Sequence, residues 1–241
     1  MEKSVSTASL KMQKNKQGNL STVLLTTAYL APVSYYTILS QSENVLLENF
    51  DSYEKQTYRN RCEIATANGM MALSIPVEKS GAEKVLTRDI RISKHNNWQS
   101  HHWRSIESAY NSSPFFEYYI DDLLPFYSKE WKFLWDFNFE IQSKVLELLD
   151  CEIQIVHTTE YKKTVDENIV DLRNSFNTKT ANSILETKPY YQVFSQRFGF
   201  QKDLSIIDLL FNMGNESQLI IANSPLNPPK EDLKKYSINI V

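Results

Sequence analysis

The sequence predicts a single compact α/β domain, in which a mixed sheet with an N-terminal β-α-β unit and a β-hairpin is followed by a helical middle region. Three observations support this: a strand–helix–strand pattern over residues 21–48, an Asn-Gly pair between two alternating runs, and helical periodicity from about residue 96. Apolar residues recur at every second position in half-buried strands and every three or four positions in helices. We expect a flexible Ser-, Lys- and Gln-rich tail at residues 1–18 and the domain at residues 19–241.

Composition narrows the class of protein. With 41% apolar and 23% charged residues over 241 positions, the chain is a typical globular protein that can bury a substantial core. Its net charge of −3 provides no general attraction for nucleic acid, so we expect no nucleic-acid partner. Residues 20–42 lack charge, but Pro32 and several Ser and Thr make them too polar for an integral membrane segment. Cys62 and Cys151 are far apart without a CxxC pair, which is typical of a reducing cytoplasm.

The first elements form a β-α-β unit. Residues 21–29 are rich in β-branched and aromatic residues and predict a buried strand. Pro32 suits the first turn of a helix over residues 32–41, and a short strand follows at residues 44–48. This order predicts two parallel strands joined by a right-handed crossover.

A hairpin comes next. Asn68 and Gly69 separate two alternating runs, and a type I′ turn at these residues pairs Ile64 with Leu73. Because side chains alternate along a strand, this register places Arg59 and Arg61 on the face opposite the apolar one.

The remaining elements are mainly helical. We expect a strand at 89–93, helices at about 96–110, 114–127 and 131–149, a strand at 152–157, a long polar loop at 158–188, and a final helix at 203–214. The first of these helices carries a stripe of four residues that should face the core: Trp98, His102, Ile106 and Ala109. Gly214 is a suitable residue to end the last helix.

Common catalytic motifs are absent. The five glycines form no GxGxxG, GxxxxGK[ST] or GxSxG pattern. His101 and His102 are adjacent, so their side chains diverge by about 100° on a helix and suit one metal ion poorly. We expect neither a metal nor a cofactor.

The stretch KQTYRNR, residues 55–61, concentrates cations before the hairpin. One interpretation is a charged edge that prevents strand-to-strand aggregation. The other, which we favour, is an anion site: Arg59 and Arg61 present planar guanidiniums suited to phosphate or carboxylate, with Lys55 and Asn60 as further donors.

Isolated polar side chains are the other candidates. His102 lies on the apolar stripe, which favours a hydrogen-bonded core residue, although an imidazole could also serve as a general acid or base. Asp208 lies between apolar residues in SIIDLLF, which favours a paired structural carboxylate.

From about residue 22 to 215 the chain resembles the WbqC-like protein family of bacteria. The resemblance is carried by KQTYRNR with NG…LSIPV, by NNWQSHHWRSIESAYNSSPFFEYY, and by YYQVFSQRFGFQKDLSIIDLLFNMG. The positions that match the family's recurrent polar residues are Lys55, Asn60, Arg61, Trp98, His102, Tyr110 and Asp208. The first β-α-β unit also resembles, distantly, nucleotidyltransferases of the HIGH type, but PVSYY replaces their HxGH.

The resemblance implies a cytoplasmic protein of bacterial surface-polysaccharide biosynthesis, of O-antigen or capsule. It implies a transferase that moves an acyl or aminoacyl group to a sugar precursor and binds a small anionic, sugar-linked substrate. In this hypothesis Lys55, Arg59 and Arg61 hold the anion and His102 moves protons. The further candidate substrate-binding residues are Asn60, Trp98, Tyr110 and Asp208. The alternative is a non-catalytic binding or scaffold subunit of a glycan assembly pathway. The sequence does not indicate an oligomeric state.

Overall fold

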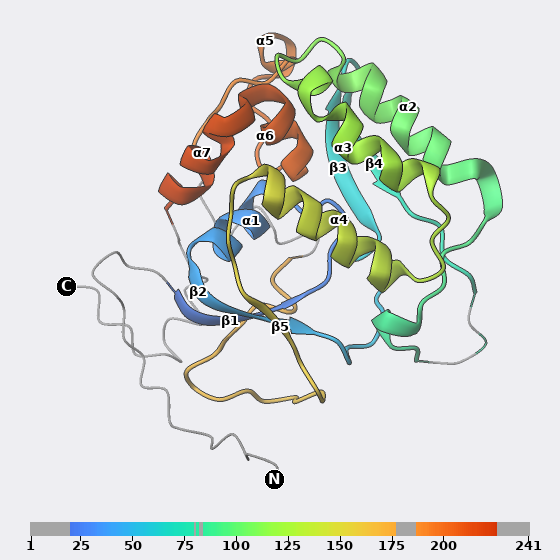
Figure 1. Cartoon of the computed structure of the whole chain (residues 1–241), viewed down its shortest axis with the longest axis vertical. Helices are drawn as coiled ribbons and strands as arrows, with labels where there is room; N and C mark the ends of the chain where they lie inside the picture. Colours follow the sequence, from blue (N-terminus) through green and yellow to red (C-terminus); the bar gives the residue numbers. More distant parts are fainter. Residues whose placement is uncertain (1–19, 80, 82–83, 177–186, 226–241) are drawn as a thin grey trace.

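The predicted α/β fold is confirmed in a computed structural model, which describes residues 20–79, 81, 84–176 and 187–225. The tail predicted at residues 1–18 lies outside the described residues. A four-stranded parallel sheet with the order β5-β2-β1-β6 lies at one end of the molecule, and a separate two-stranded hairpin stands beside the helices (Figure 1).

The β-α-β unit forms as predicted. Strand β1 (Leu20–Thr26) leads into helix α1 (Val33–Ser40) and then into β2 (Ser42–Glu48), with β1 and β2 parallel and in register from Leu20–Ser42 to Thr26–Glu48. Short strands β5 (Ile155–His157) and β6 (Val170–Asp171) add to either side. β6 therefore lies within the segment for which the sequence predicted only a polar loop.

The hairpin is confirmed, but its predicted register is wrong. Strands β3 (Arg61–Thr66) and β4 (Gly69–Ser74) pair Ile64 with Met71, not with Leu73. The turn consists of Ala67 and Asn68, and within Thr66–Gly69 only Gly69 has a positive φ, at 102°. A positive-φ glycine after the turn matches the strand twist as well as a type I′ turn does, so the Asn-Gly pair predicts a hairpin without fixing its register.

The strand predicted at residues 89–93 does not form. Residues Thr87–Asp89 form the 3₁₀ turn η1, and Arg91 and Ile92 make only isolated bridges, to Phe133 and Val77. The alternation of Ile90 and Ile92 toward the core suits any extended segment, whether or not it has strand neighbours. The Ile92 N–H donates to the Lys132 carbonyl, and the Ile90 carbonyl accepts from the Leu134 N–H, so this segment is held by single contacts to residues 132–134.

The middle of the chain is helical as predicted, and its stripe of Trp98, His102, Ile106 and Ala109 is buried. The helices are α2 (Trp98–Tyr110, after the 3₁₀ turn η2, His95–Asn97), α3 (Phe116–Ser128), α4 (Leu134–Leu148), α5 (Ser195–Phe198) and α6 (Ile206–Met213). The 3₁₀ turn η4 (Gly214–Glu216) and helix α7 (Ser217–Asn223), which the sequence analysis did not predict, follow α6.

Gly214 ends α6 for two physical reasons. Its φ is 56°, a value that favours glycine, and a Cβ at this position would lie 2.6 Å from the ring of Phe115. The residue thus lets the connection between α6 and α7 pass directly over α3's first turn.

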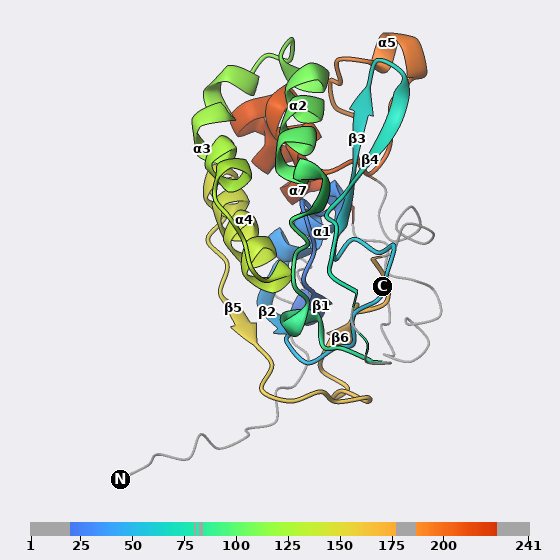
Figure 2. The ribbon, with the colours of Figure 1, turned by 90° about the vertical axis from the view of Figure 1, so that its right-hand side faces the viewer.

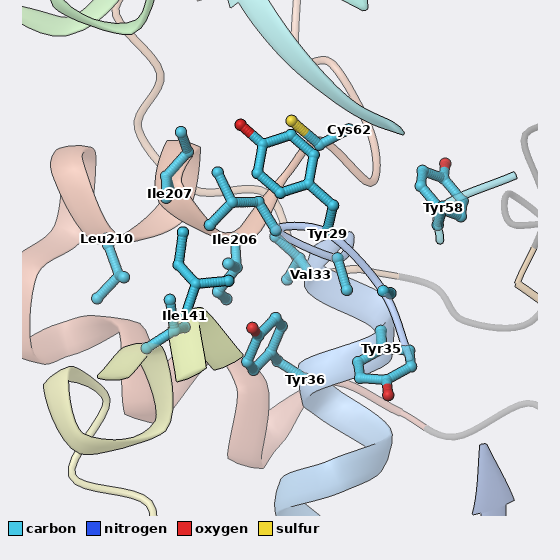
Figure 3. Packing of buried hydrophobic residues seen from close by; sticks show 14 of the residues in the cluster. Tyr29, Val33, Tyr35, Tyr36, Tyr58, Cys62, Ile141, Ile206, Ile207 and Leu210 are labelled. Carbon is cyan, nitrogen blue, oxygen red and sulfur yellow. The ribbon is translucent and has the colours of Figure 1, made fainter. Parts of the chain in front are cut away.

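One core joins the parallel sheet, the hairpin and the helices. Tyrosines fill much of it: Tyr29 lies beside Cys62 of the hairpin, and Tyr36 of α1 faces Ile141 of α4 and Ile206 of α6 (Figure 3). Because residues of the sheet and of the hairpin belong to the same buried cluster, the chain forms a single compact domain.

Candidate functional site

The carboxyl edge of the parallel sheet is the first place to look for a site. Strand β1 has β2 on one side, reached through α1, and β6 on the other, reached much later in the chain. In open α/β sheets, ligands bind outside the carboxyl ends of the strands, where the strand order reverses in this way. Here that point lies at the ends of β1 and β6.

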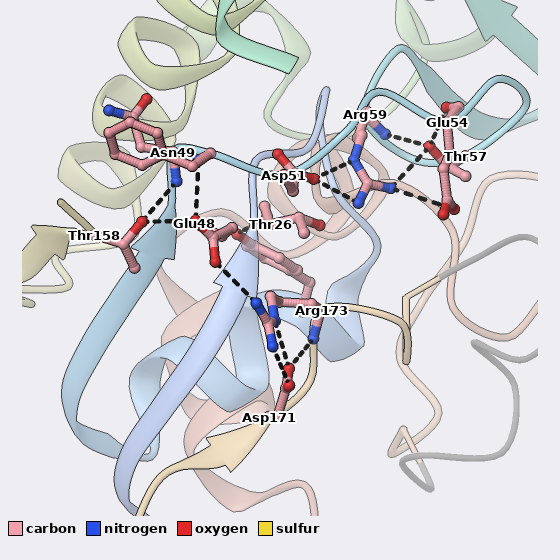
Figure 4. A network of polar contacts seen from close by, with 12 residues as sticks. Thr26, Glu48, Asn49, Asp51, Glu54, Thr57, Arg59, Thr158, Asp171 and Arg173 are labelled. Carbon is pink, nitrogen blue, oxygen red and sulfur yellow. Dashed lines mark hydrogen bonds and ion pairs between the residues drawn. The ribbon is translucent and has the colours of Figure 1, made fainter. Parts of the chain in front are cut away.

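A charged network occupies this edge (Figure 4). Arg173, two residues after β6, donates from Nε and Nη2 to the two carboxylate oxygens of Asp171, at 2.9 and 2.6 Å. Its Nη1 donates to Oε2 of Glu48, the last residue of β2, at 2.9 Å. Glu48 is 1% exposed, and its Oε1 accepts from Thr158 Oγ1 at 2.7 Å. The ends of β2 and β6 and the chain after β5 are thus connected by one guanidinium and two carboxylates.

A second ion pair lies beside the first. Arg59 donates from Nε and Nη2 to Oδ2 of Asp51, at 2.8 and 2.6 Å, and both side chains are buried. Burial raises the pKa of Asp51, and the Arg59 guanidinium opposes that rise. The negative charge of Glu48 adds a smaller upward effect on the pKa of Asp51.

The stretch KQTYRNR connects this edge to the hairpin, and its polar side chains have different environments. Lys55 is exposed, and Asn60 donates to the Ile75 carbonyl. Arg61 is about one-third exposed and pairs with Glu63 at 3.3 Å, and its buried Nε has no hydrogen-bond partner among the described residues. Arg59 and Arg61 therefore bind different carboxylates.

His102 and Trp98 lie inside an aromatic cluster. His102 Nδ1 and Tyr29 Oη are 2.9 Å apart, Tyr29 and Tyr127 share a 2.8 Å hydrogen bond, and the Trp98 ring meets His102 edge-on. Burial lowers the pKa of His102 to about 4, an effect partly offset by a hydrogen bond with the Ser74 backbone. The imidazole is therefore neutral at pH 7 and enclosed.

Tyr110 and Asp208 are brought together as partners. Oδ1 of Asp208 accepts from Tyr110 Oη at 2.9 Å, and Oδ2 accepts from Tyr190 Oη at 2.8 Å and from Gln192 Nε2 at 2.9 Å. Tyr110 Oη in turn accepts from the backbone N–H of Ala65 in the hairpin. Burial raises the pKa of Asp208 to about 6, against the effect of its three neutral donors. This carboxylate connects α6, α2, the hairpin and the segment before α5.

The N-terminus of helix α1 is occupied by the chain itself. Asp203 accepts from the backbone N–H of Ser34 at 2.9 Å and from its hydroxyl at 2.8 Å. A helix N-terminus after the first strand is a natural anion site. The Asp203 carboxylate fills this one, and burial raises its pKa to about 6.

Sequence reasoning missed Glu48, Asp51, Asp171 and Arg173. Glu48 and Asp51 follow an apolar strand, which is a recognisable signal for residues at a sheet's carboxyl edge. Asp171 and Arg173 were assigned to a polar loop because the two-residue strand β6 has no periodicity to detect.

Two further observations concern the described residues as a set. No group of three or more His, Cys, Asp or Glu side chains in this part of the chain is arranged to hold a metal ion. No helix in it is long and apolar enough to cross a membrane.

The comparisons with known proteins agree with the resemblance. The uncharacterized protein Rv1507c of Mycobacterium tuberculosis is 23% identical over 215 residues, covering 78% of this chain and 92% of that protein. No solved structure matches the chain. The model of the WbqC-like protein family matches residues 27–194. This range includes the charged network of Glu48, Asp171 and Arg173, the stretch KQTYRNR, His102 and Tyr110. Since this match spans more than half of the sequence, the chain belongs to the WbqC-like protein family.

Proposed function

We propose that the protein binds a small anionic, sugar-linked metabolite at the carboxyl edge of its parallel sheet and acts in cytoplasmic steps of bacterial surface-polysaccharide biosynthesis, as a transferase of an acyl or aminoacyl group. The observation that carries the binding step is the pair of buried guanidiniums, Arg59 and Arg173, held by carboxylates where the strand order reverses.

The chemistry of this edge suits an anion with hydroxyl groups. A guanidinium presents five N–H donors in a plane, and each of the three side-chain nitrogens of Arg173 makes one hydrogen bond among the described residues, which leaves donors for a phosphate or carboxylate. Lys55 and Arg61 add positive charge along the adjoining connection, where Arg61 Nε is unpartnered among the described residues. The nearby carboxylates of Glu48 and Asp171 are acceptors suited to sugar hydroxyls.

A thermal-shift screen tests binding. We would compare nucleotide-sugars, phosphosugars, acyl-CoA and aminoacyl donors on the wild-type protein, Arg61→Ala, Arg173→Lys and the exposed control Arg91→Ala. One ligand class should raise the Tm of the wild type and of Arg91→Ala, with the rise reduced in Arg61→Ala and Arg173→Lys. Circular dichroism without ligand identifies a variant that fails to fold. If Arg173→Lys fails to fold, Arg61→Ala alone tests the site. Unchanged ligand response in the folded variants would refute the proposed site.

The alternative, a non-catalytic binding or scaffold subunit, is favoured by one observation. His102, the proposed proton carrier, is 5% exposed and bonded to Tyr29. A His102→Ala protein that folds and fully supports glycan production in cells would support the scaffold and remove His102 from any catalytic role. Loss of glycan with normal protein abundance would support the transferase.

A further inference from the structure

A surface hollow lies at the end of the molecule away from the parallel sheet. It has a volume of about 330 Å³ and is formed between the turn of the hairpin and the outer face of α2. Its lining includes Asn68 and Met71 from the hairpin and Arg104, Ser105 and Ser108 from α2. The tip of the hairpin and this half of α2 lie far from the parallel sheet in both views (Figures 1 and 2). We call this hollow the hairpin groove.

The hairpin wall of the groove is held in place by hydrogen bonds. Thr66 Oγ1 donates to the Gly69 carbonyl at 2.7 Å and accepts from the Asn68 N–H at 3.2 Å. Arg197 of α5 donates to the Ala67 carbonyl, and α5 lies on the side of the hairpin away from α2 (Figure 2). Because the turn is already ordered by these contacts, a ligand entering the groove would lose little affinity to ordering it.

The groove contains an unused cation. Arg104 is exposed, and none of the described residues pairs with its guanidinium in an ion pair or a hydrogen bond. It therefore differs from Arg59 and Arg173, which are held by carboxylates. A guanidinium with all its donors free can bind a carboxylate or a phosphate in a two-armed manner.

The other lining groups suit a hydroxylated ring. Ser108 and the Asn68 side chain offer a hydroxyl and an amide, which can both donate and accept. Met71, which is 40% exposed, and the small residue Ala109 provide an apolar surface for the C–H face of a sugar.

We propose that the hairpin groove binds an acidic saccharide, a hydroxylated ring with one carboxylate or phosphate that pairs with Arg104. This site is separate from the charged edge of the sheet and does not depend on the function proposed there. If the proposed glycan function holds, on which this last role rests, the groove would hold a charged sugar residue of the acceptor chain.

Two-dimensional amide NMR on the full chain, titrated with glucuronic acid, glucose 6-phosphate and glucose, tests this directly. Glucuronic acid or glucose 6-phosphate should shift the amides of Thr66–Met71 and of the second half of α2, while glucose binds at least about tenfold more weakly, the expected effect of a lost charged hydrogen bond. A response to glucuronic acid alone identifies the carboxylate as the recognised group, and a response to glucose 6-phosphate alone identifies the phosphate.

Three variants complete the test. Arg104→Gln should weaken binding of the acidic sugar about tenfold, because it keeps a polar side chain and removes the charge and the guanidinium donors. Ser108→Trp should block the groove while leaving Arg104 in place, and Arg91→Ala is the control that should bind as the wild type does. The proposal is overturned if none of the three sugars shifts these amides, if glucose binds as well as the acids, or if Arg104→Gln binds them unchanged. Neither groove variant alters Arg61 or Arg173. A negative result for the hairpin groove therefore leaves the proposed anion site at the sheet edge untouched.

Discussion

Two regions of the molecule bury ionisable groups in opposite ways. At the carboxyl edge of the sheet, charges are paired with charges: Arg59 with Asp51, and Arg173 with Glu48 and Asp171. In the interior between the hairpin, α2 and α6, His102, Asp203 and Asp208 have only neutral hydrogen-bond partners among the described residues.

The difference separates a candidate binding site from a structural core. An opposite charge close by favours the charged form of each partner in an ion pair. Groups with neutral partners instead shift toward their uncharged forms, as the lowered pKa of His102 and the raised pKa of Asp208 show. The interior therefore holds elements together, and the sheet edge is where we propose that an anion binds.

Breaking an ion pair at the edge should have the largest effect. Arg59→Met leaves the Asp51 carboxylate buried without its cation, which should lower the free energy of unfolding by about 3–5 kcal/mol. Urea denaturation of this variant measures the loss, with exposed Arg91→Met as a control expected to change by less than about 0.5 kcal/mol. A further Asp51→Leu substitution in Arg59→Met should recover part of the stability. A loss below about 1 kcal/mol in the single variant would show that this pair does not hold the edge together.

The interior should respond to acid through His102. The folded protein keeps this imidazole neutral down to a pKa of about 4, whereas the unfolded chain protonates it near 6.5. Lowering the pH from 7.5 to 5 therefore favours the unfolded state by about 2 kcal/mol at this residue. Urea denaturation at both pH values should therefore show a loss of stability that is about 2 kcal/mol smaller for His102→Gln than for the wild type. Identical pH dependence in the two proteins would contradict a neutral buried imidazole.

Asp208 should act in the opposite direction and more weakly. Its pKa is raised from 3.8 to about 6, so it stabilises the fold fully below 3.8 and loses this contribution as the pH rises through 6. Between pH 7.5 and 5 the wild type should gain about 1 kcal/mol from this group. Asp208→Asn lacks the gain and should lose more stability on acidification, while the exposed control Asp121→Asn should follow the wild type. A variant profile parallel to the wild type would indicate an ordinary carboxylate.

Lys55 should show the smallest effect on stability. Its side chain is exposed, so Lys55→Ala should change the free energy of unfolding by less than about 0.5 kcal/mol. If Lys55 contributes to an anion site, the same variant should show a smaller ligand-dependent rise in Tm. A large stability loss would instead assign Lys55 to the fold.

The sequence predicts those parts of the fold that have a repeating pattern. The β-α-β unit and the buried stripe of α2 follow from apolar periodicity. β6 and α7 were missed because they are short, and the hairpin register because Gly69 serves two kinds of turn equally well.

The candidate site was only partly predictable for a related reason. KQTYRNR marks Arg59 by local charge density, whereas Arg173 comes from a segment more than 100 residues later and is brought to Glu48, at the same edge, only by folding. No local pattern connects residues that meet through the order of strands in a sheet.

Hydrogen-exchange mass spectrometry of the full chain, with and without the ligand class found by thermal shift, tests the central claim most directly. Binding at the carboxyl edge should slow exchange in the peptides around Glu48–Arg61 and Asp171–Arg173, and leave the hairpin turn unchanged. A stabilising ligand that slows exchange elsewhere but not in these two segments would contradict the assignment of the site to the carboxyl edge.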